Sequence, residues 1–366
     1  MAQNERLKAL TDAGVAVWLD QIHREMIESG ELKALVDEKS LRGETSNPAI
    51  FEKAIMGGDA YDDKIEKFAG EGLDARETYL RIAIEDVTAA CDVMRPVYDE
   101  LDGHDGYVSL EVEPSVAHDT DATAKQAREL WEAVDRPNVM IKIPGTTEGV
   151  QAIEDATADG INVNVTLLFS VESYENIAEA YIRGLERRKE AGESLDVHSV
   201  ASFFVSRVDS EVDKRLEADG KEDLIGLAAI ANAQAAYQSF KRIFHGDRFA
   251  ALKEAGAPVQ RPLWASTGVK DERYDDTKYV AGLVAPETVN TMPLDTLEAC
   301  AEKLEVEGAT ADQGPTDTLQ KLADAGIDME DVTQTLLDEG IDKFVEPFDK
   351  LIAGIDEQLS KVGQSA

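Results

Sequence analysis

The sequence predicts an α/β fold in the form of a (β/α)8 barrel with additional N- and C-terminal helices. Short β-rich runs recur eight times along the 366 residues, and segments with helical periodicity separate them. Strands that alternate with helices pair in parallel through crossover connections, and eight such units in one chain favour a closed barrel. The expected strands cover residues 15–20, 41–47, 106–112, 138–144, 161–167, 200–205, 261–266 and 288–292.

The segments between the strands carry apolar residues at helical spacing. The clearest helix follows Ser170, which we expect to be its N-cap. Shorter patterns cover residues 128–134 and 208–216, and a last helix runs beyond residue 341. The apolar face after Ser170 consists of Tyr174, Ile177, Ala178, Tyr181, Ile182 and Leu185, the i, i+3, i+4, i+7 pattern of a helix that buries one side.

An open, doubly wound sheet is the competing architecture. It would usually place a glycine-rich phosphate loop after the first strand, where this chain has Asp20-Gln21-Ile22-His23. The barrel is therefore the favoured fold. No Pro-, Gly- or Ser-rich linker divides the chain, so we expect one domain over residues 1–366, with the helices from about 295 to 366 packed on the barrel.

Acidic residues outnumber basic residues, since 74 Asp and Glu against 37 Lys and Arg give a net charge of −37. A surface this acidic repels nucleic acid and anionic membranes, and we expect neither as a partner. It also repels phosphorylated molecules, so a phosphate site needs its own cations. Two explanations of the charge stay open: adaptation to high salt, and an ordinary soluble protein. Activity that fell steadily as KCl was added would argue against the first.

Other classes of site and location find no support in the sequence. Cys91 and Cys300 are far apart and form neither a disulfide framework nor a zinc motif, which fits a reducing cytosol. No HExxH, GxGxxG or GKS/T motif is present, so nucleotide binding has no support. The N-terminal segment lacks the apolar core of a secretion signal, and the most apolar stretch, 224–231, is too short to span a bilayer. We therefore expect a cytoplasmic protein.

Polar side chains collect at the ends of the expected strands, where barrels of this kind carry their active sites. A single Asn or Asp at such a position is more often a turn former. Eight strands that all end in this way are harder to explain by turn chemistry. The strand-end residues are Asp20, Asn47, Glu111, Lys142, Asn164 with Thr166, Ser202, Ser266 and Asn290.

Lys142 is the sharpest candidate because its neighbours in the strand, Ile141 and Ile143, are apolar. Side chains alternate in a strand, so Lys142 points away from both and towards the barrel mouth. A strand-end lysine that reaches solvent or pairs with an acid is an equally good interpretation of the pattern alone. A desolvated lysine loses its proton more easily and attacks carbonyl groups, and Glu111 is the nearby acid or base.

Several segments together resemble transaldolase, and most closely the longer, bacterial branch of that family. The resemblance covers residues from about 20 to 293 and continues weakly through the C-terminal helices. The combination of a lysine in an apolar strand with the NVTLLFS run is its most specific part. The matching segments are 45–48 (TSNP), 141–144 (IKIP), 164–170 (NVTLLFS), 200–207 (VASFFVSR), 264–267 (WAST) and 288–293 (TVNTMP).

The resemblance implies a transferase that moves a dihydroxyacetone unit in the non-oxidative pentose phosphate pathway. The donor would be sedoheptulose 7-phosphate or fructose 6-phosphate, and the acceptor would be an aldose phosphate. The family needs no cofactor and no metal. An arginine suits the phosphate group of such a substrate, since the planar guanidinium group donates two parallel hydrogen bonds.

The resemblance also implies roles for individual residues. Lys142 matches the Schiff-base lysine, and Asp20 matches the base that takes the proton from the C4 hydroxyl. Glu111 and Thr166 match the pair that positions a water for proton transfers. The substrate-binding matches are Asn47 and Asn164 for the dihydroxyacetone part, Ser202 and Phe204 for the channel wall, and Arg207 and Ser266 for the phosphate.

One departure from the family concerns the phosphate site. Shorter members carry an Arg two residues after the serine that matches Ser266, and here that place is Gly268. Lys270 is the nearest cation, and we expect it to take over part of phosphate binding, although a solvated loop lysine is an equally good interpretation. Two other functions stay open: a lyase like fructose-6-phosphate aldolase, and a barrel that binds sugar phosphates without catalysis. The apolar face of the last helix permits a homodimer.

Overall fold

The computed structural model describes residues 3–365 and contains a closed barrel of eight parallel strands. Each strand pairs with the next one in the sequence, and the last strand pairs with the first. The predicted (β/α)8 barrel is thereby confirmed. The strands are β1 (Val15–Leu19), β2 (Leu41–Glu44), β3 (Tyr107–Glu111), β4 (Val139–Pro144), β5 (Val163–Leu168), β6 (Ser199–Phe204), β7 (Gln260–Ala265) and β8 (Thr288–Met292).

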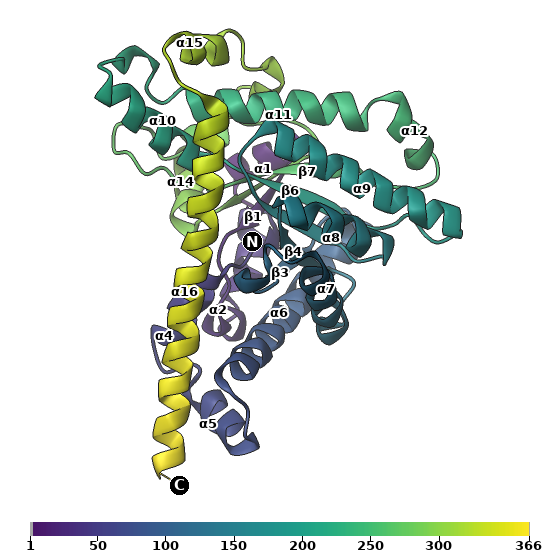
Figure 1. Ribbon diagram of the computed structural model, residues 1–366, viewed down its shortest axis with the longest axis vertical. Helices are drawn as coiled ribbons and strands as arrows, with labels where there is room; N and C mark the ends of the chain where they lie inside the picture. Colours follow the sequence, from purple (N-terminus) through teal and green to yellow (C-terminus); the bar gives the residue numbers. More distant parts are fainter. Residues whose placement is uncertain (1–2, 366) are drawn as a thin grey trace.

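Helices surround the barrel, and extra helices stand at both ends of the described chain (Figure 1). They are α1 (Glu5–Asp12), α2 (Arg24–Glu28), α3 (Glu31–Lys39), α4 (Pro48–Met56), α5 (Asp62–Glu71), α6 (Ala75–Glu100), α7 (Thr120–Val134), α8 (Thr147–Ala158), α9 (Val171–Ala191), α10 (Ser206–Ala218), α11 (Ala228–Phe244), α12 (Asp247–Lys253), α13 (Lys278–Ala281), α14 (Leu294–Lys303), α15 (Thr318–Asp324) and α16 (Met329–Ser365). Short 3₁₀ turns are η1 (Pro114–Val116), η2 (Glu222–Leu224) and η3 (Thr310–Gln313).

The predicted elements differ from the observed ones chiefly at their ends. The second strand stops at Glu44, three residues before the predicted boundary, because Asn47 is the N-cap of α4 and Pro48 is its first residue. Proline at the first helical position has a fixed φ that suits the helix and lacks an N–H that would be unbonded anyway. Ser170 caps α9 as predicted, its hydroxyl accepting from the main-chain N–H of Ser173 at 3.0 Å.

The N-terminal end of the barrel is filled by side chains. The Nε1 of Trp18 donates to Asp105 at 3.1 Å, and Arg261 pairs with the same carboxylate at 3.0 Å. Trp18 is fully buried, and a Cβ at the facing Gly43 would collide with its ring, so only glycine fits there. Small molecules therefore have to approach the barrel interior from the C-terminal ends of the strands, as is usual for this fold.

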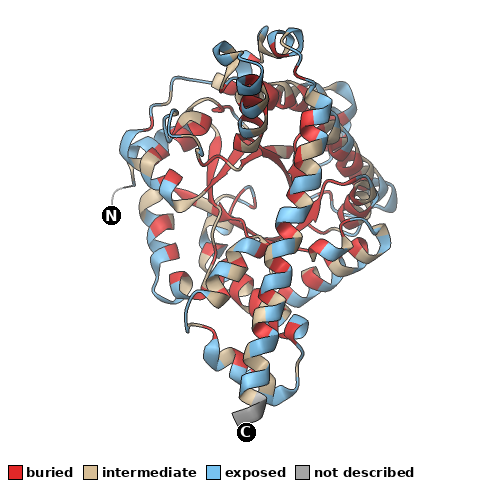
Figure 2. Ribbon diagram, turned by 60° about the vertical axis from the view of Figure 1, so that its left-hand side comes forward, coloured by how far each residue is buried: buried red, intermediate tan, exposed pale blue. Residues whose placement is uncertain are grey.

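Helix α16 lies across the open end of the barrel. Figure 2 shows it running in front of the ring of strands, and Figure 1 shows it as the longest helix of the molecule. Asp331 in its first turn pairs with Arg215 of α10 at 2.6 Å. Further along, its apolar side packs on helices α4, α5 and α6. The apolar face that suggested a homodimer is thus used within the chain, where Phe348, Leu351 and Ile355 are buried.

Candidate active site

Three polar side chains stand in register on neighbouring strands. Glu111 of β3 pairs with Lys142 of β4, and Lys142 pairs with Asn164 of β5. Residues in register on parallel strands point to the same side of the sheet, and in a closed barrel this side is the interior. The three residues, far apart in sequence, therefore form one layer inside the barrel near its C-terminal end.

Lys142 is buried, with 4% of its surface exposed. Its Nζ lies 3.1 Å from the Oε2 of Glu111 in an ion pair, and it donates a hydrogen bond to the main-chain carbonyl of Ser46 at 2.9 Å. This burial excludes the alternative that Lys142 reaches bulk solvent, whereas the other alternative, a pair with an acid, is observed. A lysine in this setting can lose its proton to a neighbouring base and act as a nucleophile.

Glu111 is the acid in contact with that amine. Burial raises the pKa of its carboxyl group from 4.5 to about 7, although the positive charge of Lys142 acts in the opposite direction, and the negative charge of Asp20 adds to the rise. A carboxyl group with a pKa near neutrality can both take up and release a proton at physiological pH. Glu111 is therefore suited to proton transfer next to Lys142.

A cavity of about 180 Å³ opens above this layer. Nine of the eleven predicted site residues line it, while Glu111 and Asn164 lie outside its lining. Besides the predicted residues, the cavity is lined by Thr45, Ala265, Gly268, Thr291, Pro293 and Phe344. The nine predicted residues are Asp20, Asn47, Lys142, Thr166, Ser202, Phe204, Arg207, Ser266 and Lys270.

Asn164 is fully buried, and its amide links residues of β3 and β6. Its Nδ2 donates to the hydroxyl of Ser109 at 2.9 Å, and its Oδ1 accepts from the hydroxyl of Ser202 at 2.7 Å. Both the nitrogen and the oxygen of this amide therefore have protein partners. Of the three residues that these hydrogen bonds join, Ser202 is the one that lines the cavity. Direct contact of Asn164 with a substrate would require these bonds to rearrange.

Thr166 and Asp20 present oxygen atoms to the cavity from opposite sides. The hydroxyl of Thr166 is buried and has no hydrogen-bond partner among residues 3–365, so it is free to bind a water or a substrate. Asp20 accepts a hydrogen bond from the hydroxyl of Thr45 at 2.7 Å, and Thr45 is also 2.8 Å from the hydroxyl of Thr291. These threonines hold the carboxylate of Asp20 at the end of β1.

The mouth of the cavity carries two cations. Burial lowers the pKa of Arg207, and the negative charges of Asp20 and Glu339 partly offset this effect. Its Nη1 is buried without a hydrogen-bond partner in the described chain. The guanidinium lies 5.1 Å from the ring centroid of Phe204. Lys270 lines the same cavity from the loop after β7, so the structure brings both basic side chains to one place.

Two strand ends around the cavity have unusual backbone conformations. Ser266 has a φ of 55° and Leu167 has a φ of 61°, and residues other than glycine rarely adopt such values. The hydroxyl of Ser266 lies 3.1 Å from that of Ser206, the residue before Arg207. The pairing of β5 with β6 changes register at this level, between Val165 and Leu168. Strained residues of this kind often stand at functional sites.

Sequence reasoning missed the contribution of helix α16. Phe344 lines the cavity, and its ring centroid lies 5.6 Å from the Nζ of Lys142. The periodicity of the helix identifies Phe344 as apolar and inward-facing, but no local signal says which surface it covers. Thr45 and Thr291 were also missed, although both neighbour predicted strand ends.

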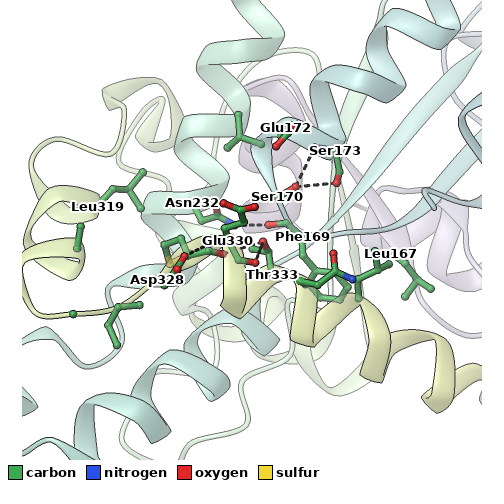
Figure 3. Close-up of a pocket in the computed structure, with 17 residues that line it drawn as sticks. Leu167, Phe169, Ser170, Glu172, Ser173, Asn232, Leu319, Asp328, Glu330 and Thr333 are labelled. Carbon is green, nitrogen blue, oxygen red and sulfur yellow. Dashed lines mark hydrogen bonds between the residues drawn. The ribbon is translucent and has the colours of Figure 1, made fainter. Parts of the chain in front are cut away.

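A second and larger pocket, of about 780 Å³, lies beside the first turns of α9 and α16 (Figure 3). Phe169 and Leu167 form part of its wall, and Asn232 donates to the carbonyl of Phe169 at 2.7 Å. Its charged lining residues, Glu172, Asp328 and Glu330, are all acidic. A phosphorylated substrate would be repelled here, so the smaller cavity at Lys142 is the candidate active site.

The sequence of almost the whole chain matches the model of one protein family. The model of the family described as Transaldolase/Fructose-6-phosphate aldolase matches residues 17–355. The chain belongs to this family. A protein named transaldolase from Mycolicibacterium smegmatis is 50% identical over 366 residues, covering 98% of this chain and 99% of the relative. One from Thermobifida fusca is 50% identical over 362 residues, covering 97% of this chain and 98% of the relative.

Membership of the transaldolase/fructose-6-phosphate aldolase family agrees with the resemblance drawn from the sequence segments. A further relative named transaldolase, from Mycobacterium tuberculosis, is 47% identical over 371 residues, with 99% of this chain and 100% of the relative covered. Among residues 3–365, no group of three or more His, Cys, Asp or Glu side chains is arranged to hold a metal ion. Nor does any helix in that range have the length and apolarity needed to cross a bilayer.

Proposed function

We propose that this chain catalyses the transaldolase reaction, the transfer of a dihydroxyacetone unit from a ketose phosphate to an aldose phosphate. The observation that carries the proposal is the buried pair of Lys142 and Glu111, 3.1 Å apart, beneath a cavity whose mouth holds Arg207. The names of the relatives, 47–50% identical over nearly their whole length, support the same reaction. The donor would be sedoheptulose 7-phosphate or fructose 6-phosphate.

In the first half of the proposed mechanism, the Nζ of Lys142 attacks the C2 carbonyl of the donor. The resulting carbinolamine loses water to form a protonated imine. Glu111, with the hydroxyl of Thr166 and a water, moves the protons for these steps, because its pKa near 7 allows it to act as acid and base. Asn47 offers its amide nitrogen to the substrate, since its Oδ1 already caps α4 at 3.0 Å.

In the second half, Asp20 takes the proton of the C4 hydroxyl, and the C3–C4 bond breaks. The bonding electrons move into the protonated imine and form an enamine on Lys142, while the aldose phosphate leaves. An acceptor aldehyde then reacts with the enamine, the same steps run in reverse, and the amine is released. Arg207, Ser266 and Lys270 bind the phosphate, and the two cations offset the acidic surface of the protein.

Trapping with borohydride tests the covalent step. Reduction in the presence of fructose 6-phosphate, followed by mass mapping of peptides, is expected to find an adduct of dihydroxyacetone on the peptide that contains Lys142. Lys142→Met should give no adduct, whereas Lys33→Met, at an exposed pair with Asp37, should give the wild-type result. A wild-type protein without any adduct would contradict the mechanism and favour a barrel that only binds sugar phosphates.

The lyase alternative is separated from the transferase by product analysis. A lyase releases dihydroxyacetone from fructose 6-phosphate at the same rate with and without erythrose 4-phosphate. A transaldolase releases little without the acceptor and forms sedoheptulose 7-phosphate when the acceptor is present. We expect the second result, since the relatives that are 47–50% identical to this chain are named transaldolase.

We also propose that residues 1–366 form one domain and that the protein is cytoplasmic. The packing of α16 on α4, α6 and α10 supports the first point, and we expect a single unfolding transition in calorimetry. The absence of a disulfide between the buried Cys91 and Cys300 is consistent with the second. A homodimer stays a proposal to be tested by light scattering, and it would have to use a surface other than the buried face of α16.

A further inference from the structure

The main chain at Asp20 is bonded to the segments on both sides of it. The N–H of Asp20 donates to the carbonyl of Met292, the last residue of β8, at 2.9 Å. The N–H of Thr45, which follows β2, donates to the carbonyl of Leu19 at 2.8 Å. These bonds extend the parallel ladders of β1 with β8 and of β1 with β2 beyond the strands themselves. The main chain that carries Asp20 therefore has a fixed position at the end of β1.

The side chain of Asp20 is bonded to a pair of hydroxyl groups. The Oγ1 of Thr45 donates to the Oδ1 of Asp20 at 2.7 Å, and the Oγ1 of Thr291 lies 2.8 Å from the same threonine oxygen. Both threonines are buried. A hydroxyl has one hydrogen to donate, and a carboxylate oxygen only accepts. Since the hydrogen of Thr45 goes to Asp20, Thr291 is the donor to Thr45. The hydrogen bonds thus run in one order, from Thr291 to Thr45 to Asp20.

The two carboxylate oxygens of Asp20 therefore have different surroundings. Oδ1 accepts from Thr45, whereas Oδ2 makes no hydrogen bond within residues 3–365. Asp20 lines the same cavity as Lys142. Rotation of the carboxylate about its Cβ–Cγ bond would break the hydrogen bond from Thr45. The hydroxyl of Thr45 thus limits this rotation and leaves one oxygen, Oδ2, available to a substrate.

We propose that Thr45 is a positioning residue for carbon–carbon cleavage, which holds Oδ1 of Asp20 and leaves Oδ2 to take the proton of the C4 hydroxyl. The inference rests on the proposed transaldolase function and adds a residue that acts through the base. As Oδ2 takes the proton, the electron pair of the O–H bond forms the C4 carbonyl. The C3–C4 bond breaks, and its electron pair passes into the protonated imine to give the enamine.

The same hydrogen bond serves the reverse step. Once Oδ2 carries the proton, Oδ1 is a carbonyl oxygen and still accepts from Thr45. The carboxyl group of Asp20 therefore keeps its place while the enamine waits for an acceptor. When C3 of the enamine bonds to the carbonyl carbon of the aldehyde, Oδ2 returns the proton to the aldehyde oxygen.

Schiff-base formation uses a different carboxyl group, which allows a specific test. In the proposed mechanism Glu111 moves the protons of that step, and the side-chain hydrogen bonds of Thr45 reach only Asp20, Thr291 and the carbonyl of Leu19. Loss of the hydroxyl of Thr45 should therefore slow cleavage and leave the attack of Lys142 on C2 unchanged. A residue that only supported the fold would affect both steps together.

The test traps both intermediates with borohydride within the first turnover of fructose 6-phosphate, without acceptor. Peptide masses give the ratio of the six-carbon adduct, which keeps the phosphate, to the three-carbon adduct left after cleavage. Thr45→Val keeps the shape of the side chain without its hydroxyl. We expect it to raise this ratio by about tenfold or more and to lower kcat for transfer to erythrose 4-phosphate by about 10²-fold, with little change in KM.

Three further variants complete the experiment. Thr45→Ser restores the hydroxyl and should recover most of the rate. Thr291→Val leaves Thr45 bonded to Asp20 and should give a smaller rise in the adduct ratio. The matched control is Thr157→Val, which removes a buried hydroxyl bonded to the carbonyl of Ile153 on α8, away from the cavity, and should leave the ratio unchanged.

The outcomes separate this inference from the proposed function. A wild-type adduct ratio in Thr45→Val, or an equal loss of both adducts, would overturn the positioning role. If Thr45→Val does not fold, Thr291→Val decides, and an unchanged ratio in that variant has the same meaning. A wild-type protein that forms neither adduct would instead overturn the proposed function.

Discussion

The Nζ of Lys142 lies 3.1 Å from the Oε2 of Glu111, and each of the two side chains has only 5% of its surface exposed. An ion pair this well buried is costly to desolvate, and it stabilises a fold only weakly. Its position beneath a cavity supports the proposed catalytic role instead. A neighbouring carboxylate that accepts a proton converts the ammonium of Lys142 into the amine that attacks a carbonyl.

The pH dependence of catalysis should follow Glu111. Its pKa of about 7 means that the carboxylate form, which accepts a proton, is lost as the pH falls below 7. We expect kcat/KM to decline on the acid side with an inflection near pH 7. Glu111→Gln should remove this inflection and lower kcat by about 10²–10⁴-fold, the usual range for acid–base help. An inflection near pH 7 that survived in the variant would assign it to another group.

The phosphate site should depend more on Arg207 than on Lys270. Arg207 is half-buried, and its Nη1 has no hydrogen-bond partner in the described chain, whereas Lys270 is exposed at the mouth. Arg207→Ala should raise the KM for fructose 6-phosphate by about 10²-fold, since a charge-assisted contact is lost. Lys270→Ala should raise it by less than tenfold. The control substrate is fructose, which lacks the phosphate, and its kcat/KM should change little. An unchanged KM in Lys270→Ala would remove Lys270 from the site.

A buried ion pair anchors the loop that carries Lys270. Lys278 pairs with Asp209 of α10 at 2.8 Å, and the side chain of Asp209 is 1% exposed. Lys278→Met would leave this carboxylate without its cation and should lower the free energy of unfolding by roughly 3 kcal/mol in urea titrations. Lys303→Met, at an exposed pair with Asp275, should cost less than about 1 kcal/mol. Equal losses in both variants would contradict this difference.

Glu44 should make the protein less stable at high pH. It is fully buried, neither of its carboxylate oxygens has a hydrogen-bond partner among residues 3–365, and burial raises its pKa to about 8. The folded state keeps the proton between pH 4.5 and 8, whereas the unfolded state releases it. The stabilisation is therefore complete below pH 4.5 and is lost as the pH rises to about 8.

Glu44→Gln removes this titration. The free energy of unfolding of the variant, relative to the wild type, should increase from pH 5 to pH 8 by on the order of 2–4 kcal/mol. Denaturant titrations at both pH values measure the difference. Glu346→Gln, at an exposed position paired with Lys350, is the control and should show no such trend. A relative stability that stayed constant across this range would mean that Glu44 is ionised in the folded protein.

The local pattern of the sequence predicted the barrel and the layer of polar side chains that Glu111, Lys142 and Asn164 form inside it. Strand and helix periodicities depend on neighbouring residues, and in this fold strand ends always meet at one edge. Local patterns were therefore sufficient to place Lys142 and Glu111 side by side. The end of β2 was predicted three residues too late, because the N-cap role of Asn47 belongs to the helix that follows.

The sequence alone determined which residues stand at the strand ends, whereas the tertiary structure decided what each of them contacts. Asn164 was expected at the substrate, but its amide is bonded to Ser109 and Ser202. Phe344 was seen only as part of an apolar face, yet it lies against Lys142. Periodicity says that a helix buries one side. The surface that the helix covers depends on the close fit of side chains from distant segments, and no local pattern contains this information. In this protein, one such contact is between Gly340 of α16 and Leu167 of β5.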